Sequence, residues 1–203
     1  MGQAMQHADK DIQREYYPDG TLQAETPCKG GKPHGIGRQY YANGNIETEI
    51  VYNNGAPEGI GKVYYESGAL QSEVSLQSGE QHGITRGYHE NGTLKAEWNY
   101  VHGKREGLSR GFYENGAVKV EWIYRDGQPH GLIHKFYKTG ELMSATPYED
   151  GLPAGQGKSY YLSGALKQVD AFDAGQLIKR TEYDESGLIT AEDLMLACDQ
   201  PSP

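Results

Sequence analysis

The sequence predicts an all-β fold, an elongated and curved antiparallel sheet made of tandem β-hairpin repeats of 24 residues. Turn glycines recur every 24 residues from Gly20 to Gly164, and Gly187 follows after 23. A second glycine series has the same period and runs from Gly31 to Gly175. Between the two series the chain alternates apolar and polar residues, as in the segment 94–100. Alternation indicates strands, and Asn-Gly or Asp-Gly between alternating segments indicates hairpins.

Eight such hairpins give about sixteen strands. A unit of 24 residues has no room for a helix between its strands, so neighbouring hairpins should pair edge to edge. We expect a single array over residues 14–189, a polar extension over 1–13, and a C-terminal cap and tail over 190–203. Thr190 and Asp193 form a candidate capping box, which predicts a short C-terminal helix. In an elongated array Cys28 and Cys198 lie at opposite ends and cannot form a disulfide.

The composition is that of a folded chain with a thin core, since only 36% of the residues are hydrophobic while 28 are glycine and 16 tyrosine. The net charge of -9 argues against nucleic-acid binding and makes direct membrane binding unfavourable, because both need clustered Lys and Arg. No stretch is apolar enough to span a bilayer, and residues 1–11 do not resemble a signal peptide. We expect the bacterial periplasm if an export signal was trimmed, and the cytoplasm otherwise.

Charged residues should pair across each hairpin. A four-residue turn over 42–45 places Tyr41 opposite Ile46 and Arg38 opposite Glu49. The same register pairs Lys62 with Glu73, Arg86 with Glu97, and Arg110 with Glu121, all on the face opposite the main aromatic residues. Such pairs can simply set the strand register on a solvated face. Alternatively, the carboxylates bind a basic partner; they are Glu25, Glu49, Glu73, Glu97 and Glu121, with Glu47 beside them.

The aromatic residues allow two interpretations as well. Rings at fixed spacing usually pack, and the glycines leave room for a ring to lie over the next strand. A single sheet cannot bury both faces, however, so some aromatic residues should meet a partner. The candidate anchors are Tyr40, Tyr64, Trp98 and Trp122.

Nothing in the sequence points to catalysis or to a cofactor. His34, His82 and His130 recur in Gly-x-x-His-Gly segments but lie two repeats apart, too far to share a metal ion, and are interpreted as turn residues. Successive glutamates lie about 10 Å apart with cations between them, which favours ion pairs over acid-base catalysis. The Gly-x-Gly segments lack the following helix that a phosphate-binding loop requires. We therefore expect a protein that is not an enzyme.

The segments 64–73 and 100–107 read Tyr-Tyr-x-x-Gly-x-Leu-x-x-Glu and Tyr-x-x-Gly-x-x-x-Gly. They resemble the MORN repeat, and more closely the bacterial MORN-variant group of the antitoxin or immunity type, over roughly residues 14–189. The resemblance implies a curved antiparallel sheet that binds protein partners. The sixth and seventh repeats depart from it, because Ala145 and Val169 replace the glutamate.

The resemblance and the acidic charge together favour an immunity protein that neutralises a cognate bacterial effector toxin by direct binding. The aromatic anchors would fill pockets on the toxin and the glutamates would speed association. A structural or membrane-peripheral MORN scaffold is the first alternative. Binding of cell-wall or other glycans through exposed tyrosines is the second.

Overall fold

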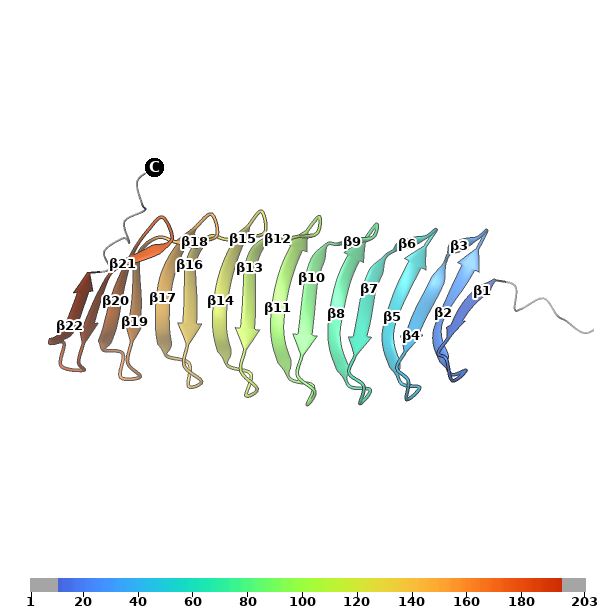
Figure 1. Ribbon diagram of the computed structural model, residues 1–203, viewed down its shortest axis with the longest axis horizontal. Coiled ribbons are helices and arrows are strands. Elements are labelled where there is room, and N and C mark those ends of the chain that lie inside the picture. The colour runs from blue at the N-terminus through green and yellow to red at the C-terminus, as the bar shows by residue number, and fades with distance from the viewer. Residues whose placement is uncertain (1–10, 195–203) are drawn as a thin grey trace, which may run out of the picture. The chain divides into compact units, whose positions relative to one another are not determined.

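The computed structural model describes residues 11–194, and all their regular structure is β (Figure 1). The chain divides into two compact units, with the boundary between Lys104 and Arg105 inside the short strand β12 (Lys104–Arg105). The first unit contains β1 (Ile12–Tyr16), β2 (Leu22–Lys29), β3 (Lys32–Pro33), β4 (Gly35–Tyr40), β5 (Ile46–Asn53), β6 (Ala56–Pro57), β7 (Gly59–Tyr64), β8 (Leu70–Gln77), β9 (Glu80–Gln81), β10 (Gly83–Tyr88) and β11 (Leu94–Val101). The second contains β13 (Gly107–Phe112), β14 (Val118–Arg125), β15 (Gln128–Pro129), β16 (Gly131–Phe136), β17 (Leu142–Glu149), β18 (Leu152–Pro153), β19 (Gly155–Tyr160), β20 (Leu166–Asp173), β21 (Gln176–Tyr183) and β22 (Ile189–Leu194).

Six of these strands are two residues long, and the sixteen others form eight antiparallel hairpins within residues 11–194. Within the first unit, β2 pairs with β4, β5 with β7 and β8 with β10. Within the second, β14 pairs with β16, β17 with β19 and β20 with β21. The expectation of hairpin repeats that pair edge to edge in an all-β antiparallel fold is therefore confirmed within each unit.

The hairpin register follows the predicted charge pairing but differs at the turn. Arg38 lies opposite Glu49 as expected, whereas Ile46 pairs with Tyr40 and not with Tyr41. A bulge between Gln39 and Tyr40 shifts the register by one residue, and Glu47 is the residue left without a partner. Tyr41 instead closes the turn, because its amide donates to the carbonyl of Asn45.

The second connection of each repeat explains the repeat length. Asn54 and Gly55 both have positive φ, 50° and 95°, as a tight hairpin turn requires. In the first repeat β3 and β4 together pair with β2, and the register shifts by two residues around His34 and Gly35. Where β20 pairs with β21 the shift is a single residue, next to Ala171. The last spacing is therefore 23 residues and not 24.

A thin core forms where rings lie over glycines that carry no positive φ. A Cβ atom added to Gly37 would meet the Tyr52 ring at 2.9 Å, and one on Gly87 would meet the Trp98 ring at 3.3 Å. In the second unit Gly157 lies in the same way under Phe172, with 3.3 Å to its ring. These contacts confirm that the glycines make room for rings. The buried apolar residues of the described range 11–194 are Ala96, Val120, Tyr124 and Ile133.

Six repeats carry two adjacent aromatic residues of which the second is a tyrosine, and the hydroxyl of this tyrosine ties one hairpin to the next. The Tyr17 hydroxyl donates to the Tyr40 carbonyl at 2.7 Å, and Tyr41 donates to the carbonyl of Tyr64 at 2.7 Å. The same bond recurs from Tyr65, Tyr113, Tyr137 and Tyr161 to carbonyls of the following hairpin, at 2.7–2.9 Å. Each bond joins residues 22 or 23 apart, so it acts between repeats and not within one.

The predicted C-terminal helix is wrong over the described residues. Thr190 and Asp193, the expected capping box, lie in strand β22, which completes the eighth hairpin with β21. Backbone pairing with β21 is available to this segment, and it satisfies the amides that a cap would otherwise serve. The remainder of the expected helix, residues 195 and 196, lies outside the described part of the chain. The strands run from Ile12 to Leu194, a few residues beyond each end of the predicted array.

The structure also bears on the expected absence of a disulfide and of a membrane-spanning segment. Cys28 is a free thiol that donates to the Thr26 carbonyl at 3.6 Å, while residue 198 lies outside the described part of the chain. Over residues 11–194, no helix has the length and apolar character needed to cross a bilayer.

Candidate protein-binding face

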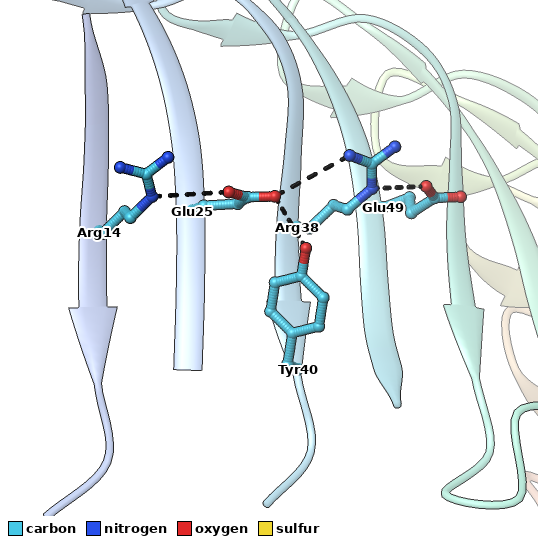
Figure 2. Close-up of polar contacts among 5 residues, drawn as sticks. All are labelled: Arg14, Glu25, Arg38, Tyr40 and Glu49. Atoms are coloured by element: carbon cyan, nitrogen blue, oxygen red, sulfur yellow. Dashed lines mark hydrogen bonds and ion pairs between the residues drawn. The ribbon is translucent and has the colours of Figure 1, made fainter. Parts of the chain in front are cut away.

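Charged side chains form a continuous row across the first hairpins (Figure 2). The Arg14 Nε lies 3.7 Å from Glu25 Oε2, and the Arg38 Nε donates to Glu49 Oε1 at 2.9 Å. Arg38 also reaches back to Glu25, 4.0 Å away. The residues come from β1, β2, β4 and β5 and lie opposite one another in register, so all project from one side of the sheet. We call this side the charged face.

Tyrosine hydroxyls join the same row. Tyr40 donates to Glu25 Oε1 at 2.8 Å, as Figure 2 shows. Tyr64 donates to Glu49 and Tyr88 donates to Glu73, both at 2.9 Å. The first tyrosine of each of these pairs therefore lies on the charged face and completes the hydrogen bonding of the glutamate in the preceding hairpin.

The row continues through each unit. In the first unit Arg86 pairs with Glu97 at 2.9 Å, and Lys62 lies in register between Glu49 and Glu73. In the second unit Arg110 pairs with Glu121 at 2.8 Å. Positive and negative side chains alternate, which balances the charge of the row in the first unit. Its members there are Arg14, Glu25, Arg38, Glu49, Lys62, Glu73, Arg86 and Glu97.

Partial burial strengthens these interactions. The Glu49 side chain is 24% exposed, and hydrogen bonds from Arg38 and then Tyr64 lower its pKa. The pKa of Arg38 is raised, chiefly by its hydrogen bond to Glu49. The pKa of Tyr64 is raised too, first by burial and then by its hydrogen bond to Glu49. The charged form of the carboxylate and the neutral form of the phenol are thus both favoured.

An exposed apolar row runs beside the ion pairs in the first unit. Ile36 and Arg38 flank the buried Gly37, so strand alternation places both side chains on the charged face. Ile36 is 44% exposed, Val51 opposite it 40%, Ile60 54% and Ile84 42%. The second unit has a corresponding set, Leu108, Ile123 and Leu132, which are exposed to a similar degree. This row was missed from the sequence, although its signal was an aliphatic residue directly after the second glycine of most Gly-x-x-x-Gly segments.

The predicted binding residues do not share one surface. Glu25, Glu49, Glu73 and Glu97 lie on the charged face with Tyr40 and Tyr64, and Glu121 lies in the equivalent row of the second unit. Trp98 alternates with Glu97 and lies over Gly87, on the opposite face. Trp122 lies over Gly111 in the same way, 3.6 Å from an added Cβ. Glu47 is the residue left over at the bulge and is not part of the row.

The histidines of the Gly-x-x-His-Gly segments lie at the strand irregularities and not in the turns. His34 follows the short strand β3, and its amide donates to the Pro27 carbonyl at 2.8 Å. His82 is in edge contact with His102, whose Nδ1 lies 3.6 Å from Glu80. Across residues 11–194, no group of three or more His, Cys, Asp or Glu side chains is arranged to hold a metal ion.

Comparison with known protein families agrees with the hairpin-repeat architecture. Repeats of this kind form binding modules and scaffolds. The sequence pattern of the MORN repeat variant matches five segments, residues 12–28, 33–54, 57–77, 81–102 and 105–126. The segments cover just over half of the chain. The chain therefore belongs to the MORN repeat variant family, whose members are generally non-catalytic.

No curated protein matches the sequence. Among solved structures, a chain of the crystal structure of TcdB2-TccC3-Cdc42 matches with 11% identity and a TM-score of 0.23. The match covers 84% of this chain and 12% of that chain, and it therefore spans only a small share of the other chain's length.

Proposed function

We propose that this chain is an immunity protein that binds a cognate bacterial effector toxin and neutralises it by covering part of its surface. The supporting observation is the exposed apolar row beside ion-paired side chains on the charged face. Apolar side chains next to satisfied polar groups make a surface suited to a protein partner. A row whose charges cancel offers nothing to a polyanion such as nucleic acid.

The excess negative charge lies elsewhere in the hairpins. Glu66 and Glu90 are exposed at turns of the first unit, and Glu114 is exposed at a turn of the second. Charges outside the contact core mainly affect the rate of association, because they act over distance before contact is made. The turn glutamates would therefore steer a basic toxin, while the apolar row and Tyr40 and Tyr64 would provide the contact. Such neutralisation needs no chemistry from the bound chain.

The test is co-expression with the effector encoded beside the gene. We expect a stoichiometric complex after purification and restored growth of cells that express the effector. Replacing one aliphatic residue of the row, Ile60→Asp, should weaken the complex at least tenfold, since it places a charge inside an apolar contact. Leu162→Asp is the matched control, because Leu162 is 56% exposed and Ile60 54%, but Leu162 lies at a turn.

Two results would contradict the proposal. One is equal binding by the Ile60→Asp and Leu162→Asp proteins, which would remove the apolar row from the interface. The other is the absence of any complex together with flotation of the chain on liposomes, which would support a membrane-peripheral scaffold instead.

A further inference from the structure

The charged row changes character in the last hairpins of the second unit. Lys158 of β19 lies opposite Ala145 on one side and Val169 on the other. Lys62 occupies the equivalent register position in the first unit, between Glu49 and Glu73. Lys158 is exposed, and it forms no ion pair with a carboxylate within residues 11–194. The repeat pattern thus leaves a cation without its usual neighbours at this position.

A hollow of about 360 Å³ lies at this place, lined by residues of β19, β20, β21 and β22. Its volume falls in the range of pockets that bind small ligands or single side chains. Leu166, Val169 and Ala171 supply much of the apolar lining, and Lys158 and Thr181 are among its polar groups. Ala145 and Val169 stand where earlier repeats have glutamates, so the surface on both sides of Lys158 is apolar.

The other charges of the lining cancel. Lys179 forms an ion pair with Glu192 across β21 and β22, and both line the hollow. Since that pair is internally balanced, Lys158 gives the hollow one unbalanced positive charge. A ligand that matches the hollow must carry one negative charge close to an apolar group.

We propose that this hollow binds the carboxyl end of a peptide whose last residue is apolar. The terminal residue carries its carboxylate and its side chain on the same Cα atom. A carboxylate held by Lys158 therefore leaves the side chain within reach of Val169 and Leu166. Charge-assisted hydrogen bonding to the lysine supplies the preference for a free carboxylate. This site does not depend on the toxin-binding proposal, and it can succeed or fail separately.

The test is a titration of the whole chain, followed by NMR, with N-acetyl-Gly-Gly-Leu and with the same peptide as its carboxamide. We expect the free acid to bind at least tenfold more tightly than the amide. Lys158→Gln should remove that preference. Val169→Glu should remove it too, because it restores the glutamate found at residues 73, 97 and 121 and pairs it with Lys158. Lys62→Gln is the matched control and should leave the preference unchanged.

Equal binding of acid and amide would overturn the proposal, and so would an unchanged preference in the Lys158→Gln protein. Acetate tests the apolar part, since it carries the charge alone. Acetate that binds as tightly as the acid peptide would show that the hollow does not recognise the side chain, and would also overturn it. Lys158→Gln changes an exposed residue, so it keeps the test decisive even if Val169→Glu fails to fold.

Discussion

Glycines serve two purposes in this chain. Those at the hairpin turns, such as Gly44 with φ 87°, adopt backbone conformations that other residues rarely reach. Gly37 is different, because its φ is not positive and its missing side chain is what matters. An added Cβ there would lie 2.9 Å from the Tyr52 ring and 3.3 Å from Thr26 Oγ1. Position 37 is therefore constrained by packing.

Gly37→Ala should destabilise the protein by about 1–3 kcal/mol, the usual cost of adding a methyl group to a filled site. Urea unfolding followed by circular dichroism measures the free energy of unfolding. In a Tyr52→Leu background the same substitution should cost clearly less, since the ring that meets the new methyl group is gone. An equal cost in both backgrounds would show that the ring is not the cause.

Glu49 should contribute to a pH-dependent stability. Its folded-state pKa lies below the usual value of 4.5, first because Arg38 and then because Tyr64 donate to it. A lowered folded-state pKa gives stability that is present above the unfolded-state pKa and is lost as the pH falls through the folded-state pKa. The wild-type protein should therefore exceed Glu49→Gln in stability at pH 7, and the difference should shrink below about pH 4.5.

Urea unfolding from pH 7 to pH 3 measures this difference at each pH, which cancels the titration of the other carboxylates. Glu47→Gln removes the same charge from the same strand, outside the row. A difference for Glu49→Gln that stays constant with pH would contradict the assigned role of the ion pair.

At the scale of strands and hairpins, the tyrosine hydroxyls add side-chain hydrogen bonds between hairpins that backbone pairing already joins. Backbone bonds join neighbouring strands, as between β2 and β4. The Tyr41 hydroxyl adds a bond to the Tyr64 carbonyl at the next hairpin, where each turn departs from the regular ladder. The two adjacent tyrosines of the second hairpin thus have different partners, since Tyr40 is bound to a glutamate and Tyr41 to the backbone.

Tyr41→Phe should cost about 1 kcal/mol, because the half-buried Tyr64 carbonyl loses its donor while the ring remains. Thermal unfolding by calorimetry detects the change. Tyr52→Phe is the control, since the Tyr52 hydroxyl forms no hydrogen bond within the described residues, and it should be nearly neutral. Equal effects of the two substitutions would refute the role of the Tyr41 hydroxyl as a link between hairpins.

At the scale of the whole chain, the repeats keep one architecture while their surface chemistry changes. The five segments that match the family end at residue 126, yet hairpins continue to Leu194. Pairing between backbones does not depend on which side chain occupies each exposed position, so Ala145 and Val169 can replace glutamates without loss of the strands. Local contacts between neighbouring repeats allow such drift, because each unit needs only its neighbours. The proposed peptide site is one result of this change in surface side chains between repeats.

Alternation and turn glycines are local signals, and they were sufficient to predict the hairpins, their edge-to-edge pairing and the partnership of Arg38 with Glu49. The bulge at Gln39 and Tyr40 was not predictable, because it depends on how one extra residue is accommodated against the partner strand. That bulge decided which tyrosine pairs with Ile46. Residues 190–194 also form a strand that their local sequence did not indicate, because pairing with β21 satisfies their backbone amides and carbonyls.

The sequence by itself determined the repeat, the order of the strands and the composition of the faces, since all three follow from spacing along the chain. Only the tertiary structure showed that Tyr40 and Tyr64 lie on the charged face and complete the hydrogen bonding of its glutamates. It also revealed the exposed aliphatic row and the hollow beside Lys158. Exposure and side-chain contacts depend on atoms contributed by several repeats at once, and no single stretch of sequence contains that information.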